Sequence, residues 1–252
     1  MSQHLLIIDP QNDFCDIPGA ALPVAGADAD MRRLARLLSQ QDFDAVTVTL
    51  DSHQRLDIAH PGFWKTAQGG AVAPFTSITA AQIKAGEFKP RDASALPRAL
   101  AYAEALEAQG RYMLMVWPVH CEIGTWGHNV HAELNAALVA WQLAHQRNVE
   151  FIIKGTNPWT EHYSALQAEV PDAADAGTQL NLALVRRLDE ADEIWIAGEA
   201  SSHCVKATVE HLAEQLKPAK LRLLTDCMSP VAGFEAQAEA FLADMRARGA
   251  QA

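Results

Sequence analysis

The sequence predicts an α/β protein with a three-layer, doubly wound fold built around a six-stranded parallel sheet. Short apolar runs alternate along the chain with longer segments in which apolar residues recur at helical spacing. Such alternation is typical of right-handed βαβ units, which place helices on both faces of a parallel sheet. With 252 residues, 49% of them hydrophobic, the chain is expected to form a single domain over 1–252.

The predicted strands are short, and several end at a polar residue. The first, Leu5 to Ile8, is followed by Asp9, and the second is a β-branched run followed by Asp51. Parallel sheets carry their sites outside the carboxyl ends of the strands, so we expect the residues that follow the strands to converge. The six strands are expected at residues 5–8, 45–50, 112–117, 150–154, 194–198 and 221–225.

Amphipathic helices are expected between these strands. Residues 29–41 carry Met31, Leu34, Leu37 and Leu38 on one helical face. The next helix begins at Pro97 and ends before Gly110, a usual arrangement of these two residue types. Further helices are expected at 130–146, 180–188, 204–216 and 236–248.

Residues 61–96 form a predicted insertion. This stretch contains several glycines and prolines and shows no sustained helical or strand period. Long irregular segments within compact domains often act as lids or binding loops. We therefore expect an irregular inserted loop region that covers the pocket or builds a subunit contact.

Composition excludes several classes of partner. The net charge of -11 argues against nucleic acid or an anionic membrane, because both select basic surfaces. The four cysteines are widely spaced, without a CxxC pair, which argues against a zinc ribbon or a disulfide framework. No signal peptide and no membrane-spanning run is recognisable. We expect a cytoplasmic homo-oligomer that acts on a small molecule.

Cys204 lies at the transition between the fifth predicted strand and the helix that follows it. Gly198 ends the strand, a turn of small residues follows, and Cys204 opens the helix. A helix N-terminus lowers the pKa of a thiol and offers N–H groups to a developing oxyanion. The alternative is that Cys204 is a small buried hydrophobe, as we expect for Cys15, Cys121 and Cys227.

Two other strand ends offer groups that could activate this cysteine. A nucleophilic thiol needs a base, and Asp9 could take its proton if burial raises the pKa of the carboxyl group. Lys154 ends the fourth apolar strand, where a charge is costly unless it is paired. It could pair with Asp9 and favour the thiolate, or simply extend to solvent.

A second group of residues has the character of a metal site. Asp51 and His53 point the same way in extended chain, so both could bind one metal ion. His60 and His120 are further candidate ligands, whereas His128 and His131 are better explained by a solvated helix start. Nitrogen and oxygen ligands suit zinc, iron or manganese.

Together these residues resemble the nicotinamidase branch of the isochorismatase-like cysteine hydrolases. Each motif is short, but six of them follow one another in order, each at a predicted strand end. They are Asp9-Pro10-Gln11-Asn12-Asp13-Phe14, Asp51-Ser52-His53 with His60, Trp117-Pro118-Val119-His120-Cys121, Lys154-Gly155 with Tyr163-Ser164-Ala165, Gly198 to Val205, and Asp226 to Phe234.

The resemblance implies a role for each site residue. Asp9, Lys154 and Cys204 would be catalytic, and the N–H groups of Ala200 and Cys204 would form an oxyanion hole beside a cis Glu199–Ala200 peptide. The flat ring of a substrate would contact Phe14, Trp117 and Tyr163. A divalent metal, zinc first, would be held by Asp51, His53 and His120, with His60 as a further candidate.

The resemblance also implies the reaction, namely hydrolysis of a small carboxamide through a thioester, with nicotinamide as the first substrate to test. Metal-free hydrolysis of N-carbamoyl or ureido compounds, an isochorismatase-type reaction and a catalytically idle binding module remain alternatives. Two departures from the family pattern stand out. Ala200-Ser201-Ser202 replaces Ala-Thr-Asp, and Glu199 stands at a position that is usually apolar.

Overall fold

The computed structural model describes residues 1–252 and contains a central sheet of five parallel strands. The sheet has the order β7-β2-β1-β8-β9, and every neighbouring pair is parallel. The strands are β1 (Gln3–Ile8), β2 (Ala45–Asp51), β7 (Glu150–Lys154), β8 (Glu193–Gly198) and β9 (Leu221–Leu223).

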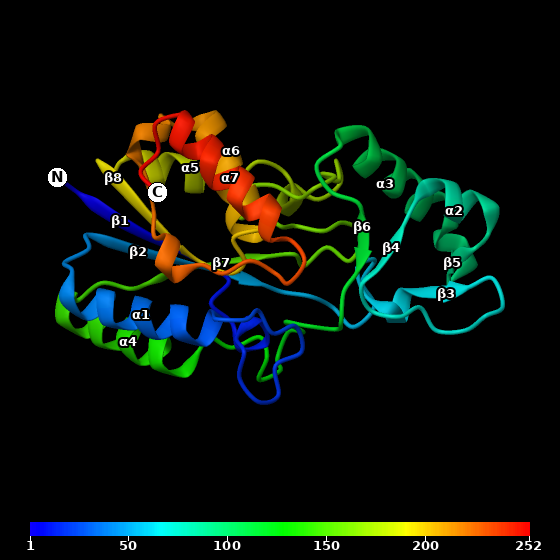
Figure 1. Cartoon of the computed structure of the whole chain (residues 1–252), viewed down its shortest axis with the longest axis horizontal. Helices are drawn as coiled ribbons and strands as arrows, with labels where there is room; N and C mark the ends of the chain where they lie inside the picture. The colour runs from blue at the N-terminus through cyan, green and yellow to red at the C-terminus, as the bar shows by residue number, and fades with distance from the viewer.

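Helices cover both faces of this sheet (Figure 1), which confirms the predicted α/β arrangement. One face packs against α1 (Ala27–Gln40) and α4 (Ala132–His145). The other packs against α5 (Leu182–Asp189), α6 (Cys204–Gln215) and α7 (Glu235–Ala247).

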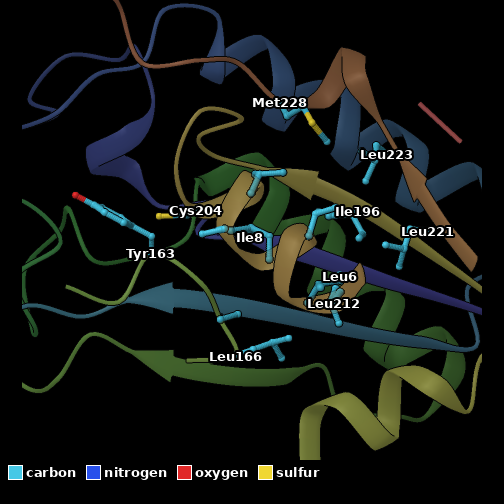
Figure 2. Packing of buried hydrophobic residues seen from close by; sticks show 14 of the residues in the cluster. Leu6, Ile8, Tyr163, Leu166, Ile196, Cys204, Leu212, Leu221, Leu223 and Met228 are labelled. Carbon is cyan, nitrogen blue, oxygen red and sulfur yellow. The ribbon is translucent and has the colours of Figure 1, made fainter. Parts of the chain in front are cut away.

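The alternation of side chains along β1 explains why its whole run is apolar. Leu5 and Ile7 enter a cluster of 16 buried residues on the α1 and α4 face, whereas Leu6 and Ile8 enter a cluster of 30 on the opposite face. Figure 2 shows Leu6 and Ile8 beside Ile196 of β8 and Leu212 of α6. The central strands are thus buried on both sides, and their carboxyl ends are held rigidly.

The expected sixth strand of the sheet, residues 112–117, lies elsewhere, so this part of the prediction was wrong. Only β6 (Leu114–Val116) is extended, and it pairs antiparallel with β4 (Thr76–Ile78). The inserted segment supplies this alternative partner, and Leu114 and Val116 bury themselves in a third apolar cluster away from the main sheet.

The insertion is also more ordered than expected. It contains a second antiparallel pair, β3 (Trp64–Thr66) with β5 (Phe88–Pro90), and a short helix, α2 (Ala80–Ala85). With α3 (Leu96–Gln109) these elements enclose 12 buried apolar residues, Trp64 and Tyr102 among them. Each element spans only three to six residues before α3, too few for a periodic sequence pattern.

The insertion stands at one end of the molecule, beyond the carboxyl ends of the sheet strands (Figure 1). The chain leaves the sheet after β2 and returns before α4. No helix is long and apolar enough to cross a membrane.

Candidate active site

Asp9, Lys154 and Cys204 meet at the carboxyl ends of the strands. Asp9 follows β1, Lys154 is the last residue of β7, and Cys204 is the first of α6. The Lys154 Nζ lies 2.8 Å from Asp9 Oδ2 and 3.7 Å from Cys204 Sγ. Because β2 separates β7 from β1, only a long side chain such as lysine can span this distance.

Lys154 is buried, and its charge is paired with two carboxylates. Its ammonium group also donates to Asp51 Oδ1 and to the carbonyl oxygen of His162, each at 2.9 Å. Burial alone would lower the pKa of Lys154, but the carboxylates of Asp51 and Asp9 raise this pKa well above its usual value. Lys154 therefore remains a cation and does not extend to solvent.

Asp9 is held in one orientation by Thr49. The Thr49 hydroxyl donates to Asp9 Oδ1 at 2.5 Å and accepts from the Asp9 backbone N–H at 3.0 Å. Burial raises the pKa of Asp9, and the nearby Lys154 opposes this rise. A carboxylate with a raised pKa is a stronger base, as the removal of a thiol proton requires.

The expected lowering of the Cys204 pKa was wrong. Complete burial raises the pKa of this thiol well above its usual value, and the opposing effect of Lys154 is smaller. Asp9 and Asp51 raise the thiol pKa further, because a thiolate beside carboxylates is disfavoured. The resting thiol therefore keeps its proton, and a base is needed at the moment of attack.

The turn before Cys204 presents two free backbone donors. The Glu199–Ala200 peptide is cis, as the resemblance implied. Neither the Ala200 nor the Cys204 N–H donates a hydrogen bond within the protein. The turn is anchored next to Asp9, because the Glu199 N–H donates to the carbonyl oxygen of Ile8 at 2.9 Å.

Three histidines gather beside this group. The candidate ligand atoms of His53, His60 and His120 all lie within 4.8 Å of one another, and all three side chains are buried. Asp51 Oδ2 lies 3.0 Å from His53 Nε2 and 3.5 Å from His120 Nε2. The Nε2 of His60 is buried without a partner.

The outer ring nitrogens of the same histidines are already occupied. The Nδ1 atoms of His53, His60 and His120 face Asp57 Oδ2 at 3.1 Å, the Gln54 carbonyl at 3.2 Å and the Pro118 carbonyl at 2.8 Å, respectively. Such contacts fix a histidine so that its other nitrogen can bind a metal. The donor set therefore fits a divalent cation, and His60 is part of it.

Two buried carboxyl groups of this region were missed from the sequence. Asp57 orients His53, and Glu161 Oε1 lies 3.9 Å from His53 Nε2. Asp57 follows His53 by four residues and could have been noticed as a partner. Glu161 carried no signal, because the fold alone brings it to His53.

Phe14, Trp117 and Tyr163 line a small cavity of about 30 Å³ together with Cys204 and Ala200. The indole N–H of Trp117 donates to the Tyr163 hydroxyl at 3.0 Å. Figure 2 shows Tyr163 beside the sulfur of Cys204. The three rings therefore place flat, mainly apolar surfaces beside the thiol.

Other residues considered from the sequence lie outside this site. Cys15, Cys121 and Cys227 are buried and pack in the apolar clusters. His128 contacts the Ser52 hydroxyl at 2.8 Å. His131 is buried rather than solvated and pairs with Asp28 at 3.0 Å.

Comparison with known proteins finds two similar nicotinamidases. No model of a protein family matches the sequence. Nicotinamidase from Saccharomyces cerevisiae is 24% identical over 212 residues, covering 83% of this chain and 81% of the yeast protein. Nicotinamidase from Escherichia coli is 29% identical over 210 residues, covering 81% of this chain and 73% of the bacterial protein.

Solved structures share the fold along the whole chain. A nicotinamidase/pyrazinamidase from Acinetobacter baumanii superposes with a TM-score of 0.66 at 21% identity, covering 99% of this chain and 94% of that one. A pyrazinamidase from Pyrococcus horikoshii, solved in complex with zinc, gives a TM-score of 0.58 at 20% identity, covering 100% and 98%. The resemblance to the nicotinamidase branch of the isochorismatase-like cysteine hydrolases, first inferred from six short motifs, is confirmed by the two nicotinamidase relatives, and the solved structures confirm the fold.

Proposed function

We propose that this chain is an amidohydrolase that converts a small aromatic carboxamide, nicotinamide first, to the acid and ammonia through a thioester on Cys204. The observation that carries this proposal is the meeting of Asp9, Lys154 and Cys204 at three strand ends, with the lysine within 2.8 Å of the base and 3.7 Å of the thiol. The similarity to two nicotinamidases supports the choice of substrate.

In the first half of the reaction, Cys204 Sγ attacks the amide carbonyl carbon while Asp9 takes the thiol proton. Lys154 stabilises the thiolate and keeps Asp9 oriented. The carbonyl oxygen becomes an oxyanion, and the free N–H groups of Ala200 and Cys204 can hold it. Asp9 then gives its proton to the nitrogen, the C–N bond breaks and ammonia leaves.

In the second half, water hydrolyses the thioester. Asp9 takes one proton from the attacking water, and the C–S bond breaks to release the carboxylic acid. The proton on Asp9 returns to the Cys204 sulfur, so the enzyme ends as it began. The raised pKa of Asp9 suits a group that must both accept and donate a proton.

Asp51, His53, His60 and His120 are the residues that would hold a divalent metal, zinc first. A cation there would position and polarise the bound substrate rather than generate the nucleophile. The unpartnered Nε2 of His60 and the zinc complex of the Pyrococcus horikoshii pyrazinamidase support this assignment. The four ligands also argue against a metal-free reaction on ureido compounds, which would not need them.

The test is an ammonia-release screen over nicotinamide, pyrazinamide and N-carbamoyl compounds, with metal content measured on the same protein. Cys204→Ala should lower turnover by on the order of 10⁴-fold or more, because no other group can form the thioester. The matched control is Cys227→Ala, because Cys227 is also a buried free cysteine but lies away from the site. This variant should retain turnover. Retained activity in Cys204→Ala would refute the mechanism.

A further inference from the structure

One fully buried carboxyl group has no part in the proposed reaction. Glu199 stands between Gly198, the last residue of β8, and Ala200, whose free N–H is one of the two proposed oxyanion donors. The side chain is 0% exposed. An apolar residue would be easier to bury, so the carboxyl group needs an explanation in terms of its partners.

The Glu199 side chain connects the nucleophile turn to two other parts of the chain. Its Oε2 accepts from the Ser229 backbone N–H at 3.2 Å. The Ser229 hydroxyl in turn donates to Asp30 Oδ2 on α1 at 2.6 Å. Asp30 is itself buried and paired with Arg33.

The loop that Glu199 holds also contacts the turn directly. The carbonyl oxygen of Ser229 accepts from the Ser201 N–H at 2.9 Å, and the Val231 N–H donates to the Ser202 hydroxyl at 3.0 Å. Val231 lines the same cavity as Ala200 and Cys204. Movement of this loop would therefore shift both the oxyanion donors and one wall of the pocket.

The raised pKa of Glu199 indicates a neutral carboxyl group, which can act as a hydrogen-bonding clamp. Burial raises its pKa well above the usual value, and the nearby Asp30 carboxyl group raises this pKa further. Asp16 acts in the same direction, and the Ser229 N–H opposes it. A neutral carboxyl group can accept from the Ser229 N–H through Oε2 without burying an unpaired charge, while its Oε1 has no hydrogen-bond partner in the protein.

We propose that Glu199 is a positioning residue that clamps the Ser229 loop and helix α1 to the nucleophile turn, and so sets the place of the Ala200 and Cys204 N–H groups. This inference rests on the proposed function, because the donors matter only if an oxyanion forms there. Small displacements of such donors slow the reaction strongly, and a misplacement of about 1 Å can lower turnover by on the order of 100-fold.

The test compares Glu199→Leu with Glu199→Gln. Leucine has a similar size but cannot accept from Ser229, whereas the amide oxygen of glutamine can still accept from the Ser229 N–H. Glu199→Leu should lower kcat for nicotinamide by about 10- to 100-fold with KM changed less than about threefold. Glu199→Gln should stay within about threefold of wild type in both constants.

The control is Glu239→Leu, which makes the same replacement at an exposed position of α7. This variant should match wild type. Metal content and the far-ultraviolet circular dichroism of every variant are measured alongside. A folded, metal-replete Glu199→Leu protein with unchanged kcat overturns the inference, as does a Glu199→Gln protein as slow as Glu199→Leu. If Glu199→Leu does not fold, Ser229→Ala, which removes only the hydroxyl bound to Asp30, is judged by the same kcat and KM criteria.

The rate of Cys204 alkylation by iodoacetamide separates this inference from the proposed function. If the wild-type protein releases no ammonia from any carboxamide, the proposed function fails and the alkylation rate alone decides the positioning role. A loosened turn exposes the thiol, so Glu199→Leu should be alkylated faster than wild type and Glu239→Leu. Equal alkylation rates in the three proteins would overturn the clamp.

Discussion

At the scale of single residues, burial decides the chemistry of this site. Asp9, Asp51 and Lys154 are each at most 5% exposed, and an isolated charge so deeply buried would be strongly disfavoured. Two carboxylates around one ammonium group compensate most of this cost. The same burial raises the pKa of the Cys204 thiol, so the mechanism proposed above needs Asp9 as a base.

His53 is the residue on which the metal assignment can be tested most directly. His53→Ala removes one of the clustered nitrogens, and we expect a large loss of bound metal with a smaller effect on folding. Metal content after gel filtration measures this, and KM for nicotinamide should rise. His128→Ala, which removes a neighbouring histidine outside the cluster, should keep its metal. A metal-replete His53→Ala protein would show that the site lies elsewhere.

His4 gives a prediction for acid stability that is independent of the active site. Burial, followed by the nearby Arg187, lowers the pKa of His4 to about 4, whereas the unfolded value is 6.5. Between these values the unfolded chain binds more protons, so stability is complete above pH 6.5 and is lost as the pH falls toward 4.

This one histidine should lower the free energy of unfolding by about 2 kcal/mol between pH 7.5 and pH 5. Urea unfolding of wild type and His4→Gln at both pH values measures the effect, because other buried histidines contribute equally to the two proteins. The wild-type protein should lose more stability than the variant. An identical loss in both would contradict the assignment.

Single residues were predictable from the sequence where they follow a strand. Asp9 and Lys154 stand at the ends of apolar runs and Cys204 follows one after a short turn, and the geometry of a parallel sheet brings such positions together. Glu161 and the partners of Glu199 were not predictable, because loops distant in sequence supply them. The raised pKa of Cys204 also depends on Asp9 and Asp51, and the sequence does not show how close these carboxylates lie to the thiol.

At the scale of elements, the closest approach in the site is between β1 and β8. A side-chain Cβ at Gly198 would lie 2.0 Å from the carbonyl oxygen of Ile8, a backbone atom that cannot rotate away. Glycine is therefore required for the two strand ends to place Asp9 beside the nucleophile turn. The apolar runs that predict the strands do not reveal this requirement.

Gly198→Ala should therefore destabilise the protein by more than about 4 kcal/mol or prevent folding altogether. Gly69→Ala is the matched control, because Gly69 also has a positive φ of 84° but no atom within 4 Å of the added Cβ. Backbone strain alone should cost about 1 kcal/mol there. Denaturant unfolding, or the yield of soluble protein, measures both, and equal stabilities would contradict the steric argument.

The helices and strands that were predicted correctly differ in length and apolar pattern from those that were missed. Strands β1, β2, β7, β8 and β9 and the long helices carry continuous or periodic apolar patterns and were located within a few residues. The elements of the insertion are three to six residues long and gain their stability from tertiary contacts around Trp64. The run at 112–117 was misassigned to the main sheet because a strand pattern does not identify its partner.

At the scale of the whole molecule, the histidine cluster joins the insertion to the sheet. We propose that residues 1–252 form one domain in which the segment between His53 and His120, which contains the insertion, is fixed at both of its ends by this cluster. His53 follows β2, and His60 lies at the start of the insertion. His120 stands on the returning chain after β6. A cation bound by all three would tie the departing and returning segments to each other and to Asp51.

Removal of the metal should therefore loosen the insertion more than the sheet. A ligand present at about 100 times its Kd stabilises the states that bind it by about 2.7 kcal/mol, and states with the insertion detached would lose this contribution. Hydrogen exchange before and after chelation should show faster exchange in residues 56–116, with β1 and β8 little changed. In His53→Ala, chelation should change nothing, because the site is already lost. A uniform increase across the chain, or none, would show that the cation does not fix the insertion in place.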